Sequence, residues 1–316
     1  MRPTRLLLLC TFALATALLL LLTAPASRAQ TVYVGSTGTD TVGSFDLATG
    51  VATPGFTPIA LGGIPNGLTL SGNALYATSG SGTLSAYDAT TGAALAGFTT
   101  VTGLSEPTGV AFSGGNLYVA NYNGNSITAY NATTGAALGG YLSPSGLNQP
   151  IGLAISGGTL YVGNEGLGSV QAFSLATGVA VPGFSPISLL APYGLTISGT
   201  ALYATNFNGD TLSAYDATTG AALPGFTTQT GANGLSAPWQ VAAAGGNLYV
   251  ANSNGNTITA YNATTGARDL SYISPSGLNQ PASIAISAPV PEPGSALLLL
   301  GGTALLALRP RRTGRA

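Results

Sequence analysis

The chain has 316 residues with 46 Gly and 19 Pro, no histidine, no lysine and a single cysteine, Cys10. This composition excludes a histidine general base, a His-ligated metal centre, a catalytic lysine and an internal disulfide. The formal net charge is −1, but residues 30–289 hold eight carboxylates against Arg268 alone, a net charge of −7. An acidic domain argues against nucleic acid as a partner, because phosphate binding depends on basic side chains.

The N-terminal 29 residues are typical of a secretory signal. Arg2 and Arg5 precede an apolar run over 6–22, and small residues lead up to Ala29. This order predicts a helical signal peptide over 1–29 that the secretion channel receives and signal peptidase cleaves after Ala29. We therefore expect an exported protein that resides in the cell envelope, on the cell surface or outside the cell.

Six copies of one unit fill residues 31–287. Each copy holds a Val/Leu-Tyr-Val/Ala strand, then an alternating strand, a Thr-Gly turn, a short strand ending in an aromatic residue, and a fourth strand after a proline. The tyrosines recur at spacings of 43, 42, 43, 42 and 46 residues, at Tyr33, Tyr76, Tyr118, Tyr161, Tyr203 and Tyr249. Four short strands in such a period predict an all-β fold, a six-bladed β-propeller with four antiparallel strands per blade.

The two ends of this domain are expected to meet. The chain enters the first unit at its tyrosine strand and leaves on an innermost strand over 283–287. We expect this C-terminal strand to complete the first blade, with Ile284 and Ile286 beside Val32 and Val34. Pairing of the two ends would close the ring without a disulfide.

Three aromatic columns and a longer repeat support this arrangement. The columns hold Tyr33, Tyr76, Tyr118, Tyr161, Tyr203 and Tyr249; Phe45, Tyr87, Tyr130, Phe173, Tyr215 and Tyr261; and Phe56, Phe98, Tyr141, Phe184, Phe226 and Tyr272. We expect them to pack between neighbouring blades. Blades 1, 2 and 3 share turn sequences with blades 4, 5 and 6, which indicates a duplicated three-blade unit. The blade pattern Leu-Tyr-Val-Ala-Asn followed by Thr-Ala-Tyr-Asn resembles the NHL and YVTN propellers, a resemblance that implies a fold and no particular activity.

Asparagines recur where the tyrosine strands end, at Asn121, Asn164, Asn206 and Asn252. A ring of amide oxygens is one way to hold a hard cation such as Ca²⁺. The alternative, which we favour, is that Asn and Gly cap their own turns, so no cofactor is predicted. The Asp or Asn before each Thr-Gly turn is likewise expected to bond its own turn, as at Asp46.

A few aromatic residues stand outside the columns, and three of them fall on adjacent blades. Tyr193, Phe207 and Trp239 map to strand starts or loops on the face where a propeller channel opens. Beside amide side chains, exposed rings are suited to sugars. We predict a binding site on this channel face, with a polysaccharide or a protein as ligand, formed by Tyr193, Phe207, Trp239, Gln240, Asn121, Asn206 and Asn252. Packing at the rim is the alternative role for these rings.

Catalysis is the alternative function. Propellers of the gluconolactonase and streptogramin lyase type look similar in blade pattern, but their sites resemble metal centres or bases built with His or clustered carboxylates. This chain has no His, and its two glutamates within 30–289, Glu106 and Glu165, lie in different blades. Glycoside chemistry would require them to converge to roughly 5 to 10 Å. We therefore predict no catalytic residues and keep a lyase or hydrolase as the alternative.

Residues 288–316 are predicted to form a second targeting segment, at the C-terminus. The motif Val290-Pro291-Glu292-Pro293 precedes an apolar segment over 294–308 and an arginine cluster over 309–315 that includes Arg309, Arg311 and Arg312. As a helix, this segment spans only about 22 Å, shorter than a bilayer core of roughly 30 Å. Motif, apolar helix and arginines in this order resemble the PEP-CTERM sorting tail, which implies membrane contact before processing by an exosortase-like transpeptidase. An ordinary C-terminal anchor is the alternative.

Together these features predict a non-catalytic binding or structural protein of the envelope or the extracellular polysaccharide matrix. Its expected parts are a signal peptide (1–29), a propeller (31–287) and a sorting tail (288–316). Neither the ligand nor the oligomeric state follows from the sequence.

Overall fold

The computed structural model describes residues 30–141 and 143–288. The predicted signal peptide and the sorting motif with its apolar helix and arginine cluster lie outside these residues. Apart from two short 3₁₀ turns, η1 (Phe207–Gly209) and η2 (Gly231–Asn233), the regular structure described consists of β-strands. The predicted all-β class is therefore confirmed. In the part of the chain that is described, no helix has the length and apolar character needed to cross a membrane.

Six antiparallel sheets make up the described residues, and we call each sheet a blade. Blades 1 to 3, from the inner strand outward, contain β21 (Pro281–Ile286), β1 (Thr31–Ser36), β2 (Thr41–Asp46) and β3 (Ile59–Ala60); β4 (Pro65–Ser71), β5 (Ala74–Ser79) and β6 (Thr83–Asp88); and β7 (Pro107–Ser113), β8 (Asn116–Asn121) and β9 (Ser126–Asn131). Blades 4 to 6 contain β10 (Pro150–Ser156), β11 (Thr159–Asn164), β12 (Ser169–Ser174) and β13 (Ile187–Ser188); β14 (Pro192–Ser198), β15 (Ala201–Asn206) and β16 (Thr211–Asp216); and β17 (Pro238–Ala244), β18 (Asn247–Asn252), β19 (Thr257–Asn262) and β20 (Arg268–Asp269).

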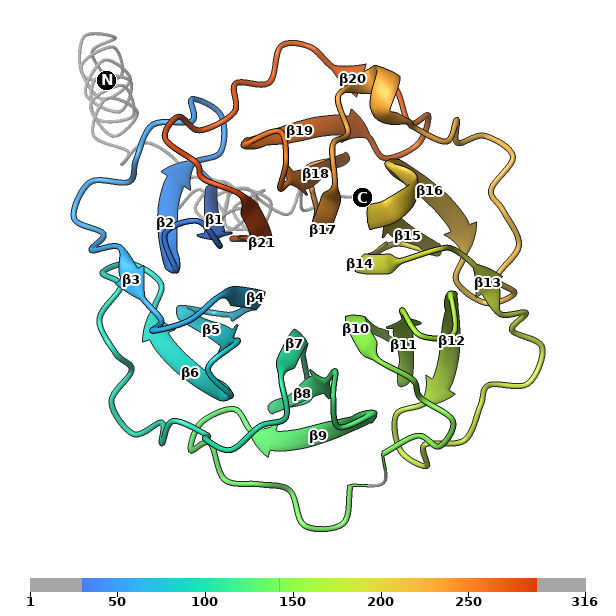
Figure 1. The fold of residues 1–316 in the computed structure, drawn as a ribbon, viewed down its shortest axis with the longest axis horizontal. Helices are drawn as coiled ribbons and strands as arrows, with labels where there is room; N and C mark the ends of the chain where they lie inside the picture. Colours follow the sequence, from blue (N-terminus) through green and yellow to red (C-terminus); the bar gives the residue numbers. More distant parts are fainter. Residues whose placement is uncertain (1–29, 142, 289–316) are drawn as a thin grey trace, which may run out of the picture. The chain divides into compact units, whose positions relative to one another are not determined.

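The blades stand around a common centre as a β-propeller, with β21, β4, β7, β10, β14 and β17 innermost (Figure 1). The first and last strands of the described residues pair with each other, with Val32 opposite Ile286 and Val34 opposite Ile284. Thr31–Ser287 form one compact unit. Blade 1 is thus built from both ends of this unit.

The prediction of four strands in every blade is wrong for three blades. Among the described residues, blades 2, 3 and 5 contain three strands each. In blades 2 and 5 the outer segment makes only single bridges to the blade edge, such as Leu84 to Val101. In blade 3 the Ser143 hydroxyl accepts the edge N–H of Ile127, and Pro144, which follows, has no N–H to offer. The outer segment of each of these blades therefore meets the blade edge at isolated points and forms no continuous ladder.

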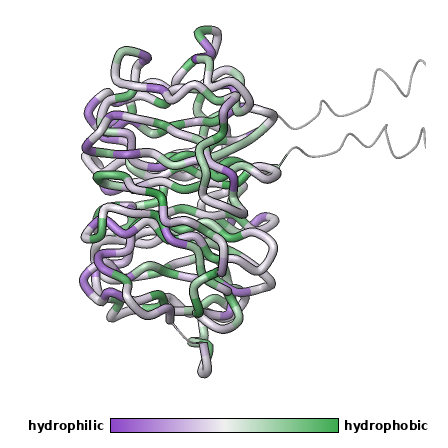
Figure 2. Tube along the Cα trace, turned by 90° about the vertical axis from the view of Figure 1, so that its right-hand side faces the viewer, coloured by the Kyte–Doolittle hydropathy of each residue, from purple (hydrophilic) through white to green (hydrophobic). Residues whose placement is uncertain are grey.

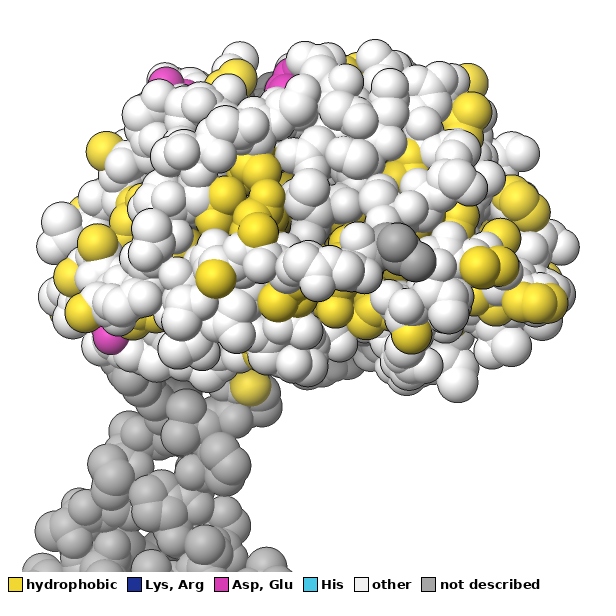
Figure 3. All heavy atoms as spheres, turned by 90° about the horizontal axis from the view of Figure 1, so that it is seen from below, with side chains coloured by type: hydrophobic (Ala, Val, Ile, Leu, Met, Phe, Trp, Pro, Cys, Tyr) yellow, Lys and Arg dark blue, Asp and Glu magenta, His cyan; other side chains and the backbone are white. Residues whose placement is uncertain are grey.

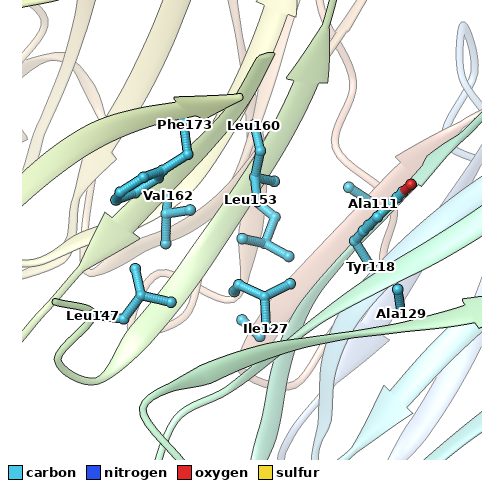
Figure 4. Packing of buried hydrophobic residues seen from close by; sticks show 10 residues of the cluster. Ala111, Tyr118, Ile127, Ala129, Leu147, Leu153, Leu160, Val162 and Phe173 are labelled. Carbon is cyan, nitrogen blue, oxygen red and sulfur yellow. The ribbon is translucent and has the colours of Figure 1, made fainter. Parts of the chain in front are cut away.

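Aromatic side chains connect neighbouring blades, as the sequence predicts. The Tyr33 hydroxyl donates to the carbonyl of Ala89 in the next blade at 2.7 Å, and Tyr203 bonds Ala263 in the same way. Each tyrosine also meets the third-column ring of its own blade edge-on, with ring centroids 5.2–5.8 Å apart. Figure 4 shows the apolar packing between blades 3 and 4, where Tyr118 and Ile127 lie in one cluster with Leu153.

The turns after the third strands also match their prediction. The Asp46 carboxylate accepts the N–H groups of Ala48 and Thr49 and the Thr49 hydroxyl, and Gly50 follows at φ +69°. Equivalent bonds recur at Asp88, Asn131, Asp216 and Asn262. In Figure 2 apolar residues lie mainly along the strands of the propeller and polar residues mainly in its loops.

Glycine sets the spacing of the inner strands. A Cβ on Gly109 would lie 2.2 Å from the carbonyl oxygen of Ile151 in the next blade, and one on Gly194 would lie 2.6 Å from that of Trp239. Blades 6 and 1 carry Gln240 and Ser283 at the same position. The side chains of these two residues bridge to the neighbouring inner strand instead, through Ile284 N–H and the Pro65 carbonyl.

Candidate functional site

Each blade places two residues at one end of the channel, on a backbone held by the same hydrogen bond in every blade. The proline that begins each inner strand lies opposite the last residue of the second strand, as Pro192 lies opposite Asn206. The next residue along the second strand then donates its N–H to the carbonyl just before the proline, as Phe207 does to Ala191 at 2.9 Å. The same bond forms in all six described blades, from Thr37, Gly80, Tyr122, Glu165, Phe207 and Ser253.

We call these six residues, with the six that follow the prolines, the mouth positions. The second group comprises Asn66, Thr108, Ile151, Tyr193, Trp239 and Ala282. Eight of the twelve line a cavity of about 790 Å³ that opens at this end of the channel. The mouth side chains on its wall belong to Asn66, Thr108, Tyr122, Ile151, Glu165, Tyr193 and Trp239, and the loops add Asp40, Glu106, Asn123 and several glycines.

Three of the predicted site residues form one aromatic cluster. Tyr193 and Phe207 in blade 5 stack with ring centroids 4.6 Å apart and an interplanar angle of 15°. Trp239 in blade 6 meets both rings edge-on, at 5.2 Å and 5.4 Å. The Thr205 hydroxyl, which donates to the Trp239 carbonyl at 2.6 Å, positions the backbone of that residue. All three rings are half-buried, so part of each remains exposed to solvent.

A carboxylate from the neighbouring blade joins this cluster. The Tyr193 hydroxyl donates to Glu165 at 3.1 Å. Burial, a hydrogen bond to Glu165 and the charges of Glu165 and Glu106 raise the pKa of Tyr122 to about 12. Burial, together with the charge of Glu165 and the hydrogen bond to it, also raises the pKa of Tyr193. Both phenols therefore stay protonated at neutral pH and act as donors toward the acidic groups.

The predicted asparagines serve the scaffold instead. Asn206 and Asn252 are buried, and their side-chain oxygens accept the backbone N–H groups of Ala191 and Ser236. Asn121 is also buried, and its amide donates to the Thr128 hydroxyl at 3.0 Å. Because these amides already bond the protein itself, we leave Asn121, Asn206 and Asn252 out of the proposed ligand surface. Asn206 and Asn252 brace the connections that lead into β14 and β17, whereas the side-chain oxygen of Asn121 is buried without a hydrogen-bond partner.

Gln240 also has an internal partner. Its side-chain oxygen accepts the N–H of Ile284 at 2.9 Å, so it spans the boundary between blades 6 and 1. Gln240 lies along the second cavity, of about 290 Å³, which runs beside the apolar ends of the inner strands and ends near Ile286. It is therefore a residue of the channel wall, away from the aromatic cluster.

Side chains that commonly bind metal ions are spread over the described residues without forming a cluster. Within residues 30–141 and 143–288, no three His, Cys, Asp or Glu side chains gather as metal ligands. Of the recurrent asparagines considered for Ca²⁺, three use their side-chain oxygens internally, as at Asn164, whose oxygen accepts the N–H of Asn148 at 3.2 Å. The fourth, Asn121, has a buried oxygen without a hydrogen-bond partner.

The main addition to the predicted site is the acidic side of the cavity. Glu106 and Glu165 line the same cavity although they belong to different blades. The Glu106 carboxylate accepts the Asn123 amide at 2.6 Å. A signal for Glu165 exists in the sequence, because it occupies the position after the strand-ending Asn that Tyr122 and Phe207 occupy in their own blades. Glu106, on a connecting loop just before a proline, carries no such signal.

The sequence matches the family described as outer membrane protein assembly factor BamB over residues 28–183 and 188–315. The chain belongs to this family. No curated protein sequence matches it. The similarity to NHL and YVTN propellers remains a prediction beside this BamB-family membership.

The chain is similar to chains in solved structures. A chain in the crystal structure of a nidogen/laminin complex is 16% identical, with a TM-score of 0.62 over 81% of this chain and 98% of that one. BamB from Moraxella catarrhalis is 22% identical, with a TM-score of 0.45 over 78% of this chain and 70% of that one. At this identity, the nidogen/laminin similarity establishes the β-propeller fold and leaves the activity open.

Proposed function

We propose that this protein is an exported, surface-sorted six-bladed propeller that binds a polysaccharide of the cell envelope or extracellular matrix at the channel mouth, without catalysis. Its membership of a family described as an outer membrane protein assembly factor supports a place in the envelope. The secretion channel, signal peptidase and an exosortase-like transpeptidase acting at Val290-Pro291-Glu292-Pro293 would be its partners during export.

One observation carries the proposed binding site. The aromatic cluster is not required by the fold, because the duplicated half of the ring does without it. Tyr193 and Trp239 correspond to Asn66 and Thr108 at the equivalent positions of blades 2 and 3, and Phe207 corresponds to Gly80. Those blades form the same three inner strands and the same loop bonds. Half-buried rings that a blade does not need for packing are suited to the apolar face of a sugar.

The exit of the chain supports surface display. All six inner strands run in one direction, beginning at the mouth with a proline and ending beside the second cavity. The last described strand does the same, and Ser287 bonds the Thr31 carbonyl at the end that is remote from the mouth. The described chain therefore leaves the propeller at the end remote from the mouth.

Replacing each ring with its counterpart from the other half of the ring tests the site. We expect the purified protein to bind glycans on an array, and Trp239→Thr and Tyr193→Asn each to weaken binding about tenfold or more, with little change in melting temperature. Phe112→Ala, which removes a half-buried ring that lines the second cavity and not the cavity at the mouth, is the matched control. Absence of glycan binding, or binding unaffected by both substitutions, would reject the proposal.

A hydrolase or lyase remains the second candidate, because Glu106 and Glu165 share one cavity with two phenol donors. Such an enzyme would release reducing ends or unsaturated products from the glycans it binds. Glu165→Gln would then abolish product formation. Binding without any product would reject this candidate.

A further inference from the structure

Every charged side chain that lines the cavity at the channel mouth is acidic. Three carboxylates, those of Asp40, Glu106 and Glu165, line it, and none of the described side chains around it is basic. Arg268, the one basic residue of the described part, lies outside the lining. Acidic side chains are sparse in the view of Figure 3 and no basic side chain is visible there. A cavity with carboxylates of one sign favours cations and disfavours anions.

Two of these carboxylates are held in place by neutral donors. Glu106 accepts the Asn123 amide at 2.6 Å, and Glu165 accepts the Tyr193 hydroxyl at 3.1 Å. Neither bond neutralises the negative charge. Because a carboxylate accepts about four hydrogen bonds, both groups keep acceptor capacity for a ligand. Both carboxylates therefore line a cavity whose described lining contains no basic side chain.

Aromatic rings lie on the same cavity wall. Tyr122, Tyr193 and Trp239 line it together with Glu106 and Glu165. Ring faces attract cations as well as the C–H face of a sugar, and Trp is the strongest of the three ring types for cations. Carboxylates and rings on one wall therefore match a ligand that combines a sugar face with a positive charge.

We propose that the ligand of this cavity is a glycan carrying free amino groups, with its ammonium groups bound by Glu106 and Glu165 and its sugar rings on Tyr193 and Trp239. This inference rests on the proposed glycan-binding function. It excludes uronic-acid glycans as preferred ligands, because their carboxylates would meet an acidic cavity without a basic side chain.

Three oligosaccharides of equal length separate the charge of the ligand from its shape. The full-length protein is titrated by calorimetry with a glucosamine oligomer, its N-acetylated form and a uronic-acid oligomer, at mildly acidic pH where the free amines are protonated. We expect the glucosamine oligomer to bind about tenfold more tightly than the N-acetylated oligomer and the uronic-acid oligomer to bind most weakly. Added salt should reduce the preference for the amine, because it screens the charges.

Charge-removing variants locate the preference. Glu165→Gln and Glu106→Gln should each remove most of the difference between the amine and the N-acetylated oligomer, while the neutral oligomer still binds. Asp46→Asn is the matched control, because it removes one carboxylate from a turn that does not line the cavity. That variant should keep the full preference.

The possible results separate this inference from the proposed function. Binding of the neutral oligomer that depends on Trp239, with no gain from free amines, overturns the inference and leaves the glycan-binding function intact. An amine preference that Asp46→Asn reduces as much as Glu165→Gln also overturns it, since the effect is then one of net charge. No binding of any oligomer overturns both.

Discussion

Residues related by the duplication of the three-blade unit are identical in the aromatic columns and different at the mouth positions. At the columns, all nine pairs of residues related by the duplication are identical, from Tyr33 and Tyr161 to Tyr141 and Tyr272. At the mouth, all six pairs differ, including Thr37 and Glu165. Both sets of positions lie on equivalent backbone, which the same loop bonds hold in each blade.

This contrast separates two roles. Column side chains pack blade against blade, and a tyrosine there fills a space and bonds a carbonyl that recurs from blade to blade, such as Ala263 for Tyr203. Mouth side chains vary in size and polarity, and most of them line a cavity, although Asn66 and Thr108 also bond a carbonyl of the next blade. Identity within the columns therefore reflects packing, and the differences at the mouth are free to serve a ligand.

The largest expected effect tests the columns. Tyr203→Ala should destabilise the protein by about 3–5 kcal/mol, because it removes a large buried ring and opens a cavity between blades 5 and 6. Trp239→Thr at the mouth should change the free energy of unfolding by about 1 kcal/mol or less, because that ring is half-buried. Urea unfolding followed by tyrosine fluorescence measures both. Equal losses in the two variants would remove the distinction between the columns and the mouth.

A neighbouring pair of residues defines where the mouth ends and the scaffold begins. Tyr193→Asn should be tolerated, since blade 2 already carries Asn66 there, whereas Gly194→Ala should destabilise the protein by about 1–3 kcal/mol. The added Cβ would lie 2.6 Å from the Trp239 carbonyl oxygen, so the inner strands of blades 5 and 6 would have to separate. Thermal unfolding of the two variants, compared side by side, checks this boundary. Unchanged stability of Gly194→Ala would mean that the inner strands of blades 5 and 6 can move apart at no cost in free energy.

Much of the scaffold and part of the site follow from the sequence. Repeat spacing and the alternation of apolar and polar residues locate the strands and the columns. Tyr193, Phe207 and Trp239, which lie outside the columns, indicate the aromatic cluster. The sequence pattern does not reveal the bond from Ala191 N–H to the side-chain oxygen of Asn206, because that bond depends on the path of the connecting loop. It also misses the contact of Tyr193 with Glu165, since neighbouring blades bring together residues 28 positions apart.

Within the columns, one identical pair departs from good packing. The hydroxyls of Tyr141 and Tyr272 are buried without a hydrogen-bond partner, whereas the other four blades carry Phe at this position. Tyr272→Phe should therefore stabilise the protein by about 1 kcal/mol, because it removes an unsatisfied polar group without opening a large cavity. Tyr203→Phe is the control of opposite sign, since its hydroxyl bonds Ala263. Calorimetric melting temperatures should rise for the first variant and fall for the second, and a fall in both would show that Tyr272 has a partner such as a bound water.

The smallest effect concerns the Thr-Gly turns, which form with either Asp or Asn as their first residue. A hydrogen bond from the Thr49 hydroxyl lowers the pKa of Asp46, and the Thr219 backbone N–H does the same for Asp216. Because the folded-state pKa lies below the unfolded value, the stability from these carboxylates is present above the ordinary Asp pKa of 3.8 and is lost as pH falls through the folded pKa. Blades 3 and 6 carry Asn131 and Asn262 at this position and form the same turn bonds, so Asp46→Asn combined with Asp216→Asn should preserve the fold at neutral pH. The double variant should lose less stability than the wild type on acidification, as measured by urea midpoints at neutral and acidic pH, and an unchanged acid dependence would assign it to other carboxylates.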